Sequence, residues 1–65
     1  MFRLKGTHIV EHGPSSSFWV KGDFVQPVIG NIYTQETDAT LFTSNEVLMI
    51  IQNFSEKYEI HVINA

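Results

Sequence analysis

The stretch LFTSNEVLMIIQNF, residues 41–54, carries the clearest structural signal in the chain. Thr43, followed three residues later by Glu46, forms a capping box, in which each side chain accepts a hydrogen bond from a backbone amide at the start of a helix. Phe42 before the cap and Val47 after it have the spacing of a hydrophobic staple. The sequence therefore predicts a helix over residues 44–54, with Thr43 as its cap.

The predicted helix has one broad apolar stripe. Its members recur at helical spacing and are Val47, Leu48, Ile50, Ile51 and Phe54. A helix of this length is stable only when its stripe is packed against other structure. We expect a sheet to provide that structure, with four residues of the stripe facing it, namely Val47, Leu48, Ile51 and Phe54.

Alternating segments on both sides of the helix supply the strands of that sheet. In residues 2–12, FRLKGTHIVEH, apolar residues and histidines share one face of an extended chain, and Gly6 is a candidate β-bulge. Residues 57–63, KYEIHVI, alternate in the same way and follow the helix after a short connection. Both segments are expected to be strands of an antiparallel sheet.

The middle of the chain predicts short strands joined by turns. GPSSS, residues 13–17, is typical of a loop, and the aromatic and β-branched residues 17–34 favour strands. Lys21-Gly22-Asp23 is one turn signal, and Gly30-Asn31 has the pattern of a type II′ hairpin turn. Pro27 should lie on an edge strand or at a bulge. The expected fold is α+β: a small antiparallel sheet, made of a meander and a C-terminal strand, with one amphipathic helix on one face, in a single domain 1–65.

Composition narrows the partners of this domain. The 65 residues include no cysteine, and the net charge is -3. Nucleic-acid binding requires cations that converge on one face, whereas the basic residues here are scattered as Arg3, Lys5, Lys21 and Lys57. No segment approaches the roughly 20 apolar residues of a membrane span, and no apolar run of signal-peptide length follows the start. We expect a cytoplasmic protein that binds neither membranes nor nucleic acid.

The three histidines are candidate metal ligands, and the chain has no cysteine. His8 and His12 are four residues apart, which suits a metal site on a helix but separates them by about 13 Å on a strand. His61 could approach either one across neighbouring strands, with Glu11 or Glu59 nearby, and the sequence leaves this open. Because no cysteine is available to complete a ligand set, no metal site is predicted.

Catalytic residues do not form a recognisable set. Ser15, Ser16 and Ser17 follow His12, and Asp23 and Asp38 are available as orienting groups, but nearness in sequence is not a triad. GPSSS also lacks the glycine spacing and the lysine of a phosphate-binding loop. The sequence therefore predicts no catalytic residues, no cofactor and no enzymatic activity.

The run DATLFTSNEVLMIIQNF, preceded by NIYTQET and followed by YEIHVI, resembles a pattern in small uncharacterised proteins of phages, prophages and Gram-positive bacteria. The resemblance covers residues 31–63 and rests on Ala39, Phe42, Thr43 and Glu46. Val47 stands where such patterns often have alanine, which implies a looser approach of helix to sheet. The resemblance implies a hairpin, a capped helix and a closing strand, and it assigns no catalytic residue.

Two hypotheses for function follow. The leading one is a non-catalytic accessory or protein-interaction domain that forms a homodimer through a sheet edge or through the sheet face opposite the helix. Its basis is that large apolar residues alternate onto both strand faces, in the pairs Ile9/Val10, Trp19/Val20, Phe24/Val25 and Val62/Ile63. The loops GPSSS and TQETDAT, residues 34–40, are the alternative cover for that face.

The second hypothesis is a small binding module for nucleic acid or a small ligand. It would use the aromatic strand face around Trp19, with Phe24 and Tyr33, because exposed aromatic rings can stack on bases. The scarcity of lysine and arginine beside these rings favours the first hypothesis.

Overall fold

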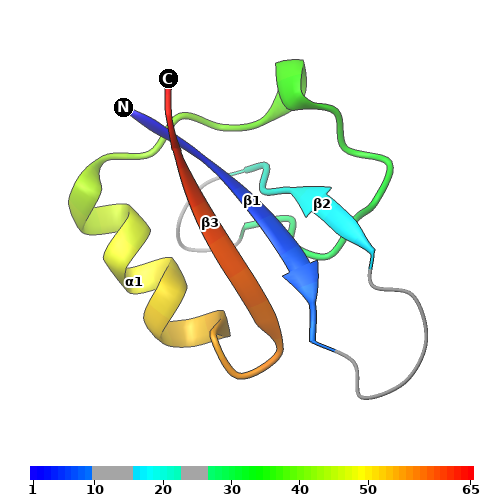
Figure 1. The fold of residues 1–65 in the computed structure, drawn as a ribbon. Coiled ribbons are helices and arrows are strands. Elements are labelled where there is room, and N and C mark those ends of the chain that lie inside the picture. Colours follow the sequence, from blue (N-terminus) through cyan, green and yellow to red (C-terminus); the bar gives the residue numbers. More distant parts are fainter. Residues whose placement is uncertain (10–15, 23–26) are drawn as a thin grey trace.

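The computed structural model describes residues 1–9, 16–22 and 27–65. Its elements, in chain order, are β1 (Phe2–His8), β2 (Ser17–Trp19), a 3₁₀ helix (Glu36–Asp38), α1 (Ser44–Phe54) and β3 (Tyr58–Asn64). β1 lies between β2 and β3 in a three-stranded antiparallel sheet, and α1 packs against β1 and β3 (Figure 1). The predicted α+β class, a small antiparallel sheet with one helix, is confirmed.

β1 and β3 pair along their whole length. The register runs from Phe2 opposite Asn64 to His8 opposite Tyr58, without interruption. Backbone hydrogen bonds extend the ladder by one residue at each end, from Ala65 N to Met1 O (3.1 Å) and from Ile9 N to Lys57 O (3.0 Å). The first and the last strand predicted along the sequence are therefore neighbours in the sheet.

The helix begins where the sequence predicted. The Glu46 amide donates to Thr43 Oγ1 at 3.3 Å, and the Thr43 amide donates to Glu46 Oε1 at 2.9 Å, so both halves of the capping box are formed. Phe42 and Val47, the predicted staple, are both buried in the core cluster. The agreement of cap and staple explains why α1 covers Ser44–Phe54 as expected.

The prediction that Leu48 faces the sheet was wrong. Leu48 is 62% exposed, whereas Ile50, which was not among the four residues expected to face the sheet, is fully buried. Successive helical residues are rotated by about 100°, so the arc that faces the sheet is centred between Val47 and Ile50 and leaves Leu48 on its flank. Ile51 and Phe54 are half-buried against the same core.

Gly6 is not a bulge. It pairs directly with Phe18 on β2 and with Ile60 on β3, so the ladder continues through it on both sides. A Cβ at this position would lie 2.6 Å from Phe18 Cε2 and closer still to Cζ. Glycine is present because the Phe18 ring, itself buried, lies directly on the backbone of β1.

The predicted meander is only partly formed. The chain does turn back after Lys21, which forms an isolated antiparallel bridge with Val28, but no described strand includes Pro27 or the segment after it. The type II′ hairpin at Gly30-Asn31 was wrong, because the turn runs from Asn31 to Thr34. There the Asn31 side chain accepts the Tyr33 amide at 3.0 Å, a local bond that competes with strand pairing.

Some predictions lie outside the described residues, namely those that concern Val10, Glu11, His12, Asp23, Phe24, Val25 and most of GPSSS. Ser17, the last residue of GPSSS, belongs to β2.

The core lies between the sheet and the segments that cover it. Its buried members are Leu4, Phe18, Val20, Phe42, Val47 and Ile50. At one end of the sheet the rings of His8, Phe18 and Tyr58 meet edge to face, with centroids 4.9 to 5.4 Å apart. The core therefore uses one face of β1 and β3, and the other face remains outside it.

The capping box yields a first prediction. Replacing Thr43 by Ala should lower the free energy of unfolding by about 1 kcal/mol, because the Glu46 amide loses its acceptor. Urea unfolding followed by helical circular dichroism measures the change. Thr43→Ser, which keeps the hydroxyl, is the control and should remain close to the wild type; an unchanged midpoint in the alanine variant would contradict the cap.

The contact at Gly6 yields a second prediction. Gly6→Ala should destabilise the protein by about 1–3 kcal/mol, because the new methyl group collides with the Phe18 ring. Phe18→Leu removes part of that ring, so it should cost less in the Gly6→Ala background than in the wild type. A double-mutant cycle from urea midpoints measures this coupling, and additive effects would show that the two residues do not collide.

Candidate interaction surface

β3 forms an outer edge of the sheet. In an antiparallel pair, hydrogen-bonded residues alternate with residues whose backbone groups point to the other side. The bonds at Lys57 and Ala65 show that the odd-numbered residues of β3 bond to β1. The N–H and C=O groups that point away from β1 therefore belong to Tyr58, Ile60, Val62 and Asn64.

No segment within residues 1–9, 16–22 and 27–65 pairs with this outer side of β3. The opposite border of the sheet differs. β2 is only three residues long, and beyond it the same side of β1 is bridged by Phe42, which exchanges two backbone hydrogen bonds with Phe2 (2.8 and 2.9 Å). The long open edge of the described sheet is thus the edge of β3.

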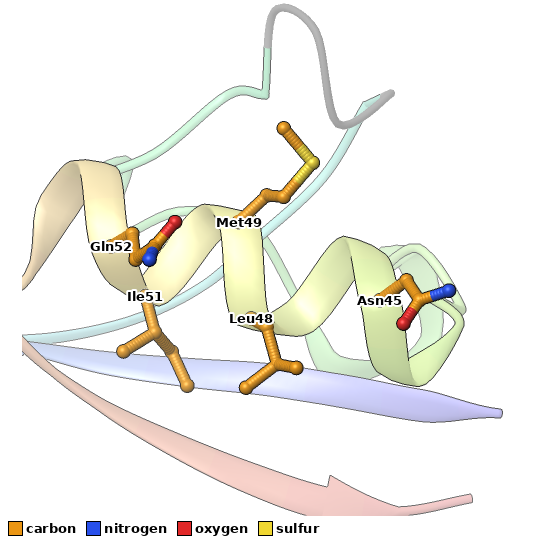
Figure 2. Close-up of a pocket in the computed structure, with 5 residues that line it drawn as sticks. All are labelled: Asn45, Leu48, Met49, Ile51 and Gln52. Carbon is orange, nitrogen blue, oxygen red and sulfur yellow. The ribbon is translucent and has the colours of Figure 1, made fainter.

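Apolar side chains accompany that edge. Val62 is 45% exposed on β3, and Tyr58 and Ile60 are half-buried beside it. On α1, Leu48 is exposed, and in Figure 2 the side chains of Leu48 and Ile51 point toward the side of the helix on which both β1 and β3 run, whereas Met49 points the other way. The open edge therefore lies next to an exposed apolar flank of the helix.

A hollow of 490 Å³ lies along this part of α1. Its described lining comes from the helix alone: Asn45, Leu48, Met49, Ile51 and Gln52 (Figure 2). Ligand pockets enclose most of a small molecule and carry a few convergent polar groups. A hollow with one helical wall does not enclose a small molecule in this way.

The outer face of the sheet, opposite α1, is mixed in character. Alternation along the strands places on it Arg3, Lys5, Thr7, Trp19, Glu59, His61 and Ile63. Lys5 Nζ lies 5.6 Å from the centre of the Trp19 ring, a cation–π contact. The exposed apolar patch expected on this face is therefore interrupted by charged and polar side chains.

The histidines that the structure describes do not come together. His8 faces the core side, where it packs between Phe18 and Tyr58, whereas His61 lies opposite Lys5 on the outer face. His61 Nε2 is 3.7 Å from Glu59 Oε1, and both side chains are exposed. In the described part of the chain no three histidine, cysteine or acidic side chains cluster as metal ligands.

The described candidates for catalysis are also separate. Ser16 precedes β2, Ser17 is the first residue of β2, and Asp38 ends an exposed 3₁₀ helix. Tyr33, proposed as part of an aromatic binding face, is 85% exposed in a turn and does not share a strand with Trp19. These positions leave the strand edge and its helical flank as the best-defined candidate site.

Comparisons with known proteins add no further assignment. No protein-family model, no curated protein and no solved structure matches this chain. Of the helices described, none is both long and apolar enough to cross a membrane. The resemblance of residues 31–63 to small phage and bacterial proteins thus remains a prediction.

The sequence predicts an interaction through a sheet edge only in general terms. It could not identify β3 as the open edge, because that depends on which strand becomes central. One signal was present: KYEIHVI contains no proline or glycine, and its only lysine precedes the strand. Edge strands that must stay unpaired usually contain such interruptions.

The separation of His8 and His61 yields a third prediction. Calorimetric titration with zinc should reveal no stoichiometric site of submicromolar affinity, because these two side chains lie on opposite faces of the sheet. A stoichiometric submicromolar site would contradict this. In that event, titration of His8→Ala and His61→Ala variants would identify which ligand is involved.

Proposed function

We propose that this protein is a non-catalytic accessory or interaction domain that acts by binding protein, first of all a second copy of itself. The observation that carries the proposal is the open edge of β3, seven residues long and bordered by exposed apolar side chains. An unpaired strand edge presents a row of backbone donors and acceptors that another strand can satisfy.

The composition of β3 supports this reading. Monomeric proteins protect edge strands with lysine, proline, bulges or short length. β3 contains no lysine or proline, is evenly paired with β1, and carries valine and isoleucine at alternate positions. β2 at the other border is protected by its short length, whereas β3 is long and Glu59 is its only acidic or basic residue besides His61.

The cell compartment and biological context belong to the proposal. We place the protein in the cytoplasm, because cysteine is absent from the sequence and the fold is formed without disulfides. An accessory role in a phage or bacterium is supported by the resemblance of residues 31–63 and by the small size of the domain.

A second candidate function is a small binding module for nucleic acid or an anionic ligand on the outer sheet face. One observation favours it: Lys5 lies over Trp19, and Arg3 Nε on the same face is buried without a hydrogen-bond partner among the described residues. The net charge of -3 opposes it. Quenching of Trp19 fluorescence by a single-stranded oligonucleotide, suppressed by salt, would favour this candidate over the first.

Self-association yields a fourth prediction. Sedimentation equilibrium at micromolar concentration should give twice the 7.4-kDa mass of the chain. The reason is that a two-fold dimer satisfies the exposed backbone groups of β3 in both copies at once. A clean monomer mass throughout the micromolar range would remove self-association as the function of this edge.

A further inference from the structure

We propose that two copies pair through β3 in an antiparallel register centred on Ile60, so that their sheets join into one sheet of six strands. This inference rests on the proposed function and specifies how the edge is used. It follows from two features of the structure: which backbone groups point outward and which side chains would meet.

The backbone restricts the register. Tyr58, Ile60, Val62 and Asn64 point their N–H and C=O groups outward, so these even-numbered residues must form the hydrogen-bonded pairs of a new ladder. With two-fold symmetry, the ladder can be centred on Ile60, on His61 or on Val62 while most of β3 stays paired. Side-chain chemistry then decides among the three.

Centring on Ile60 matches the side chains on both faces. On the core side, Ile60 meets the partner's Ile60, and Tyr58 meets the partner's Val62, which are apolar pairs of the kind that stabilise sheets. On the outer face, Glu59 lies opposite the partner's His61, and the symmetric pair repeats this contact. Glu59 and His61 are exposed and 3.7 Å apart within one chain, so both can turn toward the partner.

The other two registers match less well. Centring on His61 places the two copies of His61 against each other and sets Glu59 opposite the partner's Ile63. Centring on Val62 pairs Ile60 with the partner's Asn64 and leaves Tyr58 beyond the ladder. Directly opposed polar and apolar groups lose the cross-strand stabilisation that matched pairs provide.

The position of α1 is compatible with pairing through β3 in each of these registers. A two-fold axis that makes an edge pair antiparallel is perpendicular to the sheet, so both helices lie on the same face, one on each side of the axis. α1 packs against β1 and β3, and in Figure 2 Leu48 and Ile51 point toward the side on which these two strands run.

The first test compares two exposed positions. Val62→Lys places a charge on the paired edge and should raise the dimer dissociation constant by about tenfold, equivalent to about 1.4 kcal/mol. Leu41→Lys is the matched control, since Leu41 is 42% exposed, close to the 45% of Val62, and precedes Phe42 on the far side of β1. It should leave the dissociation constant unchanged. Helical circular dichroism checks that both variants fold.

The second test addresses the register. His61→Glu opposes two carboxylates across the axis and should weaken the dimer by about tenfold, whereas the double variant Glu59→Lys, His61→Glu restores opposite charges and should recover most of the affinity. Sedimentation equilibrium measures each dissociation constant. Restoration of most of the affinity is expected when positions 59 and 61 lie directly opposite each other, whereas a diagonal placement would restore less.

The outcomes separate this inference from the proposed function. If the wild-type protein is a monomer, both the proposed self-association and the pairing through β3 are wrong. A wild-type dimer that Val62→Lys leaves intact would keep self-association and exclude the β3 edge. If Val62→Lys weakens the dimer and the charge reversal fails to restore affinity, the edge is retained and the register centred on Ile60 is wrong.

Discussion

The pairing of β1 with β3 is the interaction on which the rest of this protein depends. It joins segments at opposite ends of the chain, with 49 residues between His8 and Tyr58 (58 − 8 − 1). Closing a loop of that length lowers the chain entropy before the strand contacts can stabilise the structure. Once the two strands meet, they supply the surface on which α1 buries Val47 and Ile50, and β1 offers its other side to β2 and Phe42. Each remaining element is therefore stabilised by a strand pair that is itself non-local.

A single ring shapes the centre of the sheet. Phe18 lies on the backbone of Gly6, touches His8 and Tyr58 edge to face, and is almost completely buried. Because the large Phe18 side chain lies opposite Gly6, the smallest residue, its ring can cover the middle of β1. This packing fills one face of the sheet only. The outer face carries mixed polar and aromatic side chains, and among the described residues no segment pairs with the outer edge of β3.

Local signals in the sequence were sufficient for the helix and for the two long strands. Thr43 and Glu46 act on each other three residues apart, and alternation in residues 2–8 and 58–64 needs no partner to be recognised. Two of the errors concern contacts between distant residues, and the third, at Asn31, concerns a local bond. The exposure of Leu48 depends on which strands lie under α1, the role of Gly6 depends on Phe18, and the turn at Asn31 depends on a side-chain bond that replaced a hairpin. The open edge of β3 could not be predicted either, because the order of strands in a sheet cannot be inferred from any single segment.

The hydrogen bond from Ala65 to Met1 has a geometric consequence for anything attached to the chain. Both ends emerge together at one end of the sheet, away from the rings of His8 and Tyr58. In an antiparallel pair centred on Ile60, each Ala65 lies five residues from the axis, about 17 Å at roughly 3.3 Å per residue. Domains fused to either end would thus be held at opposite poles, about 33 Å apart. In such a pair, the domains attached to the two copies would point in opposite directions.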